Sequence, residues 1–118
     1  MSFEVVTTVE PEYVKISVIG EYSFERLFEF IECVRSISQE TSRTRVMIDC
    51  QQMSGNMTEA ERFQGGQKIA EIFGSRIRAA LLMPEGQVTK LGELAAVNRG
   101  AKFFVTSSEH EVIPWLLA

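Results

Sequence analysis

One stretch decides the fold of this chain: residues 45–73, which read RVMIDCQQMSGNMTEAERFQGGQKIAEIF. An apolar run opens it and predicts a buried inner strand over residues 45–50, ended by Asp49 and Cys50. A polar loop follows over residues 51–57, and an amphipathic helix is expected from Glu59 to about Phe73. A strand, a loop and a helix in this order are typical of an α/β domain.

Thr58 and Glu61 mark the start of that helix, because they have the spacing of a capping box. The Thr58 hydroxyl can accept a hydrogen bond from the backbone N–H of Glu61, while the Glu61 carboxylate accepts from the N–H of Thr58. In α/β domains, ligands and partners usually bind at the carboxyl ends of the strands. We therefore expect the functional surface of this chain at the junction between residues 51 and 58.

Length and composition predict one globular domain over residues 1–118. The chain has 118 residues, of which 45% are hydrophobic and 24% are charged, and this is enough to bury one core. A formal net charge of -4 argues against nucleic-acid binding, which depends on Lys and Arg at phosphates. The sequence has no apolar run of the roughly 20 residues that a membrane span needs and no secretory signal. Two cysteines lack metal-ligand spacing, so we expect a reduced, cytoplasmic protein without metal or cofactor.

The rest of the chain continues the alternation of strands and helices. Two strands joined by the turn Glu10-Pro11-Glu12 should form an antiparallel hairpin. From the third strand on, strands alternate with helices, which implies parallel strands with right-handed crossovers. The prediction is a mixed, mostly parallel five-stranded sheet with about four helices, in the order β-β-α-β-α-β-α-β-α. The expected strands are 3–9, 13–19, 45–50, 76–83 and 101–106, and the expected helices are 23–39, 59–73, 89–99 and 108–116.

Local signals add detail to the later helices. Phe63, Gly66, Ala70 and Phe73 share the inner face of the second helix, where Gly65 and Gly66 indicate close packing or a ligand. In the third helix, Leu91, Leu94, Ala95 and Asn98 lie along one side. Gly74 and Gly100 suit helix C-termini. Ser108 and Glu111 predict a second capping box, and Pro114 should kink or end the last helix.

The first helix carries an unusually wide apolar arc. Its core face consists of Phe24, Leu27, Phe28, Ile31 and Val34. A second row, Phe30, Cys33 and Ile37, widens the arc to roughly 220°, against the ≳100° that a surface helix needs. This width predicts either a helix buried under neighbouring elements or a contact surface for another protein or a second copy of the chain.

The sequence resembles the STAS domains, and more closely the SpoIIAA-like bacterial family, whose fold is related to lipid-binding CRAL-TRIO domains. The resemblance covers essentially the whole chain. It implies a cytoplasmic, non-enzymatic bacterial regulator that binds a protein partner, as anti-sigma-factor antagonists do. The segments that carry it are VMIDC at 46–50, the capped helix from Thr58, RIRAALLMPEG at 76–86 and GAKFFVTSSEHEVIPWL at 100–116.

The same resemblance concerns phosphorylation. In antagonist-type STAS domains, an Asp-Ser-Ser-Gly motif in the loop after the strand carries the phosphorylated serine. Asp49 matches the acidic residue at the strand end, and Thr58 falls near the phosphoacceptor position. Met57 and Glu59 flank Thr58, so the motif itself is missing. Thr58 is either a phosphoacceptor or a plain helix cap, and Ser54 is a second candidate.

The candidate binding site comprises Asp49, Met53, Ser54, Asn56, Met57 and Thr58. Asp49 either orients a ligand or holds the loop, and Cys50 is either reactive or a half-buried thiol. Met47, Met53, Met57 and Met83 either fill the core or line a pocket for a small lipophilic ligand.

Enzymatic function is not expected. His110 is the only histidine, and no nucleophile motif, phosphate-binding loop or metal-ligand spacing accompanies it. Four arginines (Arg43, Arg45, Arg76 and Arg78) should gather at the opposite edge of the sheet, as a solvated rim or an anion site. The sequence thus predicts a regulatory module that binds a protein through the loop 51–57 and the following helix. The alternative is a carrier or sensor of a small lipophilic ligand.

Overall fold

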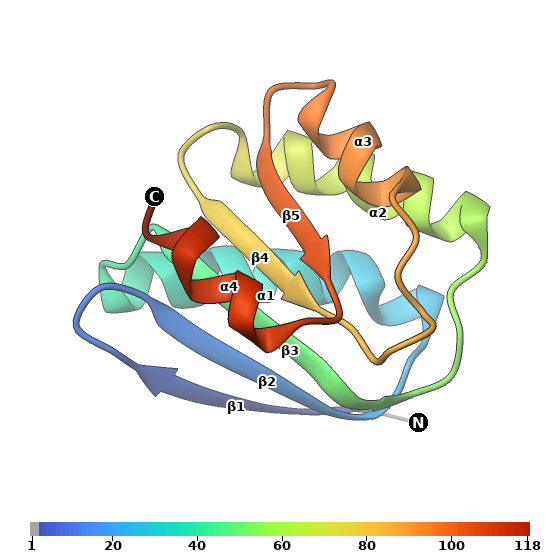
Figure 1. Ribbon diagram of the computed structural model, residues 1–118, viewed down its shortest axis with the longest axis horizontal. Helices are drawn as coiled ribbons and strands as arrows, with labels where there is room; N and C mark the ends of the chain where they lie inside the picture. Colours follow the sequence, from blue (N-terminus) through green and yellow to red (C-terminus); the bar gives the residue numbers. More distant parts are fainter. Residues whose placement is uncertain (1–2) are drawn as a thin grey trace.

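The structure, a computed structural model, describes residues 3–118 and has the predicted order of elements. Both the fold class and the order β-β-α-β-α-β-α-β-α are confirmed (Figure 1). The strands are β1 (Phe3–Val9), β2 (Val14–Glu21), β3 (Arg45–Ser54), β4 (Arg78–Leu82) and β5 (Lys102–Thr106). The helices are α1 (Phe24–Thr41), α2 (Glu59–Phe73), α3 (Leu91–Val97) and α4 (Glu109–Leu116).

The strands form one sheet in the order β1-β2-β3-β4-β5. β1 and β2 are an antiparallel hairpin, as the short turn between them predicts. The pairs β2–β3, β3–β4 and β4–β5 are parallel, because each connection crosses over through a helix. The carboxyl ends of β2 to β5 therefore lie at one edge of the sheet.

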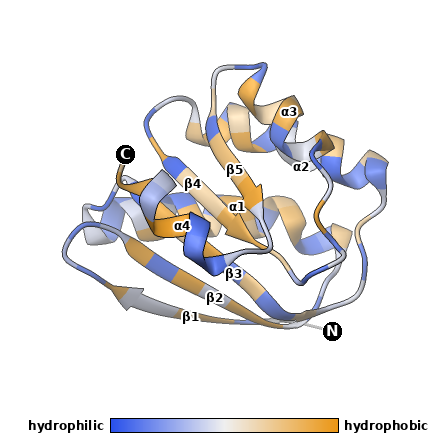
Figure 2. Ribbon diagram, viewed as in Figure 1, coloured by the Kyte–Doolittle hydropathy of each residue, from blue (hydrophilic) through white to orange (hydrophobic). Residues whose placement is uncertain are grey.

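Helices cover the two faces of the sheet unequally. α1 and α2 pack on one face and α3 packs against α2, whereas α4 crosses the other face over β3, β4 and β5 (Figure 1). Hydrophobic residues are concentrated along the central strands, and hydrophilic ones mark the first turn of α4 (Figure 2). The larger core includes Ile16, Val34, Ile48, Phe73 and Phe103; the smaller one consists of Met47, Ala80, Leu82, Val112 and Leu116.

Glycines allow α2 and α3 to pack with their backbones in contact. A Cβ atom added to Gly66 would overlap the carbonyl oxygen of Gly92 and lie 2.9 Å from Cβ of Ala95. Gly65 faces α1 instead, where an added Cβ would lie 3.2 Å from Cδ2 of Leu27. Close helix packing is thus the role of Gly66.

This packing corrects one predicted helix face. Phe63 is 37% exposed, although it was expected on the inner face of α2. Leu94 of α3 is 52% exposed. α2 presents Gly66 to α3 and Ile69 and Phe73 to the sheet, which turns Phe63 outward. α3 contacts Gly66 of α2 through its small residues Gly92 and Ala95, so the larger side chain of Leu94 points away from α2.

β3 is longer than predicted, and this corrects the boundary of the loop 51–57. β3 pairs with β2 as far as Glu21 and Ser54, whereas β4 ends opposite Asp49. A step of three residues along β3, from Asp49 to Gln52, matches a step of two along β2, from Ser17 to Ile19, so β3 contains a β-bulge. Residues 51–54 thus extend β3 beyond the end of β4, and Gly55, with φ of 90°, ends the strand. Only residues 55–57 are loop.

The C-terminal helix departs from its predicted capping. Ser108 makes no side-chain capping bond, and the carboxylate of Glu111 instead accepts a hydrogen bond from the hydroxyl of Thr106. The second capping box was therefore wrong. Pro114 lies inside α4, which continues to Leu116. Gly74 and Gly100 follow their helices with positive φ, as expected.

Two of the four arginines at the amino-terminal edge hold the fold together. Arg43 donates to the carbonyl oxygens of Glu10 and Thr41. Arg78 donates twice to the carbonyl oxygen of Trp115 and stacks over its ring at 3.9 Å. Separately, none of the helices within residues 3–118 has the length and apolar character required to cross a bilayer.

Candidate functional site: an apolar cavity at the carboxyl edge of the sheet

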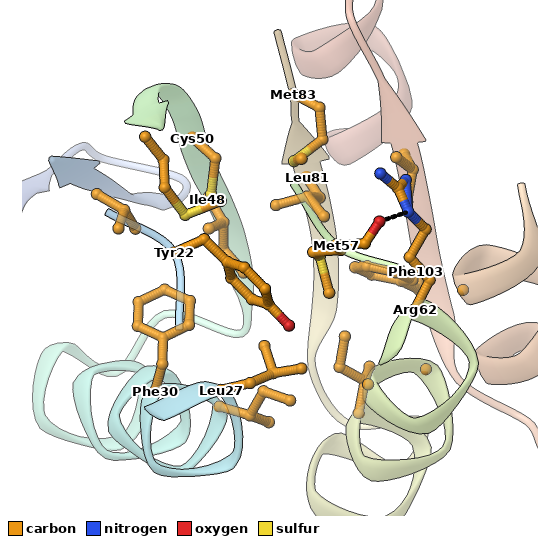
Figure 3. Close-up of a pocket in the computed structure, with 18 of the residues that line it drawn as sticks. Tyr22, Leu27, Phe30, Ile48, Cys50, Met57, Arg62, Leu81, Met83 and Phe103 are labelled. Atoms are coloured by element: carbon orange, nitrogen blue, oxygen red, sulfur yellow. Dashed lines mark hydrogen bonds between the residues drawn. The ribbon is translucent and has the colours of Figure 1, made fainter. Parts of the chain in front are cut away.

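A cavity of about 100 Å³ lies between the sheet and the helices α1 and α2. Its walls come from the strands β2 to β5, from α1 between Leu27 and Val34 and from one side of α2 between Arg62 and Phe73 (Figure 3). The lining is predominantly apolar, and its residues include Val18, Leu27, Phe30, Ile48, Cys50, Met53, Met57, Gly65, Leu81, Met83, Phe103 and Val105.

Tyr22 is the main polar group directed at this space (Figure 3). Its backbone N–H donates to the carbonyl oxygen of Ser54 at 2.8 Å, which fixes its position beside the end of β3. Its hydroxyl donates to Oε1 of Glu61 on α2 at 3.1 Å. Burial, the nearby Glu61 charge and this hydrogen bond raise the pKa of Tyr22, so the hydroxyl is a protonated donor at neutral pH.

The predicted capping box is present at the start of α2. The Thr58 hydroxyl accepts from the N–H of Glu61, and Oε1 of Glu61 accepts from the N–H of Thr58, both at 3.1 Å. The same oxygen of Glu61 accepts from the Tyr22 hydroxyl. One carboxylate oxygen therefore joins the wall of the cavity to the first turn of α2.

Arg62 closes the neighbouring side of the cavity. Its side chain is only 12% exposed, and it pairs with Glu59 at 3.5 Å. It donates to the carbonyl oxygens of Met57 (Figure 3) and Gln87 and to the hydroxyl of Thr89. These bonds tie the start of α2 to the segment before α3, and they compensate the positive charge of Arg62 within the protein.

Three of the four methionines that were expected to gather do so. Met53, Met57 and Met83 line the cavity. Met47 does not, because it points to the opposite face of the sheet and packs under α4. Side chains alternate between the two faces of a strand, and the neighbours of Met47 on β3, Val46 and Ile48, occupy the cavity face.

Asp49 lies on β3 rather than at its end. Its Oδ1 accepts from the N–H of Gln51 at 3.0 Å, next to the bulge, and its Oδ2 lies 3.8 Å from Nζ of Lys15. The interpretation that Asp49 holds the local backbone fits these contacts. The remaining candidates, Ser54, Asn56 and Thr58, are exposed at this edge, and the Ser54 hydroxyl donates to the carbonyl oxygen of Gly20 at 3.4 Å.

The second apolar row of α1 faces the protein to a large extent. Phe30 and Ile37 pack against the main core, and Phe30 also lines the cavity. Cys33 is half-buried. Phe28, expected on the core face, is instead 38% exposed and packs edge-on against Phe24. Of the two alternatives for this row, burial or an interface, burial describes Phe30 and Ile37. An interface role for the row stays a prediction.

Two candidate reactive groups differ in their surroundings. Cys50 is fully buried in the cavity wall, and desolvation followed by the charge of Asp49 raises its pKa to about 12. It is therefore a neutral thiol at pH 7. His110 is exposed on α4, on the other face of the sheet, and does not meet the cavity residues.

Sequence reasoning missed Tyr22 and Arg62. Neither belongs to a sequence motif, and their roles depend on contacts 39 and 25 positions away along the chain. One signal was available for Tyr22, an aromatic residue directly after the carboxyl end of a strand, where ligand sites of α/β domains lie.

No protein-family model matches the sequence, and no curated protein matches it significantly. Solved structures are similar in fold. An anti-sigma factor antagonist from Mycobacterium paratuberculosis superposes with a TM-score of 0.65 and 10% sequence identity, over 99% of this chain and 96% of that one. An uncharacterised protein with a SpoIIAA-like fold from Shewanella loihica gives a TM-score of 0.57 and 14% identity, over 97% and 93% of the two chains. The chain therefore has a STAS/SpoIIAA-like fold, as the sequence resemblance implied.

Proposed function

We propose that this chain is a non-enzymatic, cytoplasmic regulatory domain that binds a protein partner through the carboxyl edge of its sheet. The observation that carries the proposal is the extended end of β3, with the short loop after it and the capped start of α2. Gln51, Gln52, Ser54, Asn56 and Thr58 present polar, exposed side chains there, next to a fixed backbone. The fold likeness to an anti-sigma factor antagonist supports a role of this kind.

A matched pair of variants tests the surface. Gln52 and Gln39 are both exposed, but Gln52 lies at the carboxyl edge, whereas Gln39 lies near the end of α1, at the opposite edge. Immobilised wild-type protein should capture a specific protein from a lysate of its host. Gln52→Arg should lose that protein and Gln39→Arg should retain it. Equal capture by both variants would refute the proposed surface, and capture of only the chain itself would point to a homodimer.

Thr58 and Ser54 are the proposed phosphoacceptors of this surface. A phosphate on Thr58 would lie at the N-terminus of α2, where the helix dipole favours an anion, but it would also meet the Glu61 carboxylate of the capping box. Phosphorylation at Thr58 would thus replace the Thr58–Glu61 capping box with a phosphate at the N-terminus of α2 and would add negative charge to the carboxyl edge. Intact mass of protein isolated from its host, before and after phosphatase treatment, tests this.

A second function, the binding of a small lipophilic molecule, is favoured by the cavity itself. Its volume of about 100 Å³ is about two thirds of that of the engineered apolar cavity, roughly 150 Å³, that binds benzene. Met53, Met57 and Met83 give the wall flexible, polarisable side chains, which adapt to ligands of varied shape. Comparison of the native and denatured masses of gently purified protein would reveal a bound molecule.

A further inference from the structure

We propose that the cavity selects a compact, neutral, largely apolar molecule with one hydrogen-bond acceptor, and that Tyr22 binds this acceptor in exchange for its bond to Glu61. This inference rests on the proposed ligand-binding function. It adds the chemical class of the ligand and a route by which a ligand in the cavity affects the structure at the start of α2.

Neutrality follows from the charges around the cavity. Arg62 is the only lining residue, in the described part of the chain, with an ionised side chain, and its charge is already compensated by Glu59 and three hydrogen bonds to protein oxygens. The buried Cys50 thiol offers no charge to a ligand. A carboxylate or ammonium in this space would lose its hydration without gaining a partner, which is costly.

The size of the ligand follows from the walls. A volume of about 100 Å³ is smaller than that of the roughly 150 Å³ cavity that binds benzene, so it accommodates one small, unsubstituted ring or an equally compact chain. Gly65 contributes to the available width, because an added Cβ there would lie 3.2 Å from Leu27. Long acyl chains would extend beyond this volume.

Tyr22 supplies the polar contact. Its phenol ring comes from the β2–α1 connection, its backbone is fixed to Ser54, and its hydroxyl lies at the cavity with one partner, Glu61 (Figure 3). An acceptor on the ligand can replace that partner with no loss in the number of hydrogen bonds of Tyr22. Glu61 is half-buried, so water can solvate the carboxylate that Tyr22 releases.

Coupling follows from the shared oxygen. Oε1 of Glu61 accepts from both the Tyr22 hydroxyl and the N–H of Thr58. When the Tyr22 hydroxyl donates to a ligand instead, the N–H of Thr58 is the one of these two donors that still bonds to Oε1 of Glu61. The capping box then changes in strength and geometry. Thr58 belongs to the surface proposed for the protein partner, so ligand and partner would affect each other's affinity reciprocally.

Three compact probes of similar size test the inference: cyclopentanone (neutral, with an acceptor), cyclopentane (neutral, without one) and butyrate (anionic). Each is titrated into ¹⁵N-labelled wild-type protein and into Tyr22→Phe, and the amide spectrum reports both the fold and the site. The ratio of the cyclopentanone affinity to the cyclopentane affinity should be about 3-fold higher in wild type than in Tyr22→Phe. This is the lower end of the range for one hydrogen bond, because Tyr22 gives up its bond to Glu61. Butyrate should bind at least roughly 100-fold more weakly than cyclopentanone.

The variant separates the two levels of the proposal. Tyr22→Phe should lower the cyclopentanone affinity, leave the cyclopentane affinity unchanged and abolish the cyclopentanone-induced shift of the Thr58 amide. The same ratio of the two affinities in wild type and variant would overturn the role of Tyr22 while leaving the ligand site standing. Butyrate binding as tightly as cyclopentanone would overturn neutrality. If no probe shifts the amides around the cavity, the ligand-binding function itself fails.

Discussion

Replacing Gly66 by alanine should destabilise the domain, whereas the same replacement at its neighbour Gly65 should not. Both glycines lie inside α2, so alanine gains about 1 kcal/mol of helix propensity at either position. At Gly66 the new methyl group would overlap the backbone oxygen of Gly92 and approach Cβ of Ala95 to 2.9 Å. Neither neighbour is the end of a flexible side chain, so α3 would have to move as a unit.

The two replacements should change the free energy of unfolding differently. Overpacking of a close contact costs typically 1–3 kcal/mol, and for backbone overlap we take the upper end, which leaves Gly66→Ala about 2 kcal/mol less stable. At Gly65 the added Cβ meets only the end of the Leu27 side chain at 3.2 Å, which can turn, so Gly65→Ala should be unchanged or up to about 1 kcal/mol more stable. At about 4 °C per kcal/mol for a domain of this size, the melting temperatures should differ by roughly 8–12 °C.

Urea unfolding followed by far-UV circular dichroism measures these free energies, and the fluorescence of Trp115, the only tryptophan, gives a second probe on the opposite face of the sheet. Coincident transitions with unchanged m-values would validate the comparison. The account of the α2–α3 contact would be refuted if Gly66→Ala proved as stable as Gly65→Ala.

Three further predictions concern the cap, the buried thiol and α4. Thr58→Ala should lower the free energy of unfolding by about 1 kcal/mol through loss of the capping bond, while Thr58→Ser should retain it; thermal unfolding of the pair checks this. Because burial raises the pKa of Cys50 to about 12, the unfolded thiol ionises first. Between about pH 9 and pH 12 the free energy of unfolding should therefore fall more steeply with pH in wild type than in Cys50→Val, by on the order of 1 kcal/mol per pH unit. A parallel pH dependence in both proteins would contradict the burial of that thiol. Arg78→Met should shift the fluorescence of Trp115 and lower stability by roughly 2 kcal/mol, because the stacked guanidinium and its two bonds to the Trp115 carbonyl are lost; an unchanged emission spectrum would count against this clamp.

The fold could be predicted because its determinants are local. The turn between β1 and β2, the apolar run of β3 and the Thr58–Glu61 spacing each specify their structure within a few residues, and the alternation that follows leaves few topologies. The capping box formed as expected because both of its bonds join residues three positions apart.

The errors arose where packing between distant elements decides. Gly66 and Gly92 bring α2 and α3 together. The helical periodicity of the sequence does not reveal this contact, which turns Phe63 outward. β3 extended to Ser54 because β2 continues beside it, although its sequence there is polar. Tyr22 enters the site through a partner on α2, 39 positions later, so only the tertiary structure reveals it.

The most direct test of the proposed binding edge is native mass spectrometry of the protein purified gently from its host, as wild type, Gln52→Arg and Gln39→Arg. The account predicts a complex of the chain with one protein partner for wild type and Gln39→Arg, and the bare chain for Gln52→Arg. A bare monomer from all three, or a complex that survives Gln52→Arg, would contradict it.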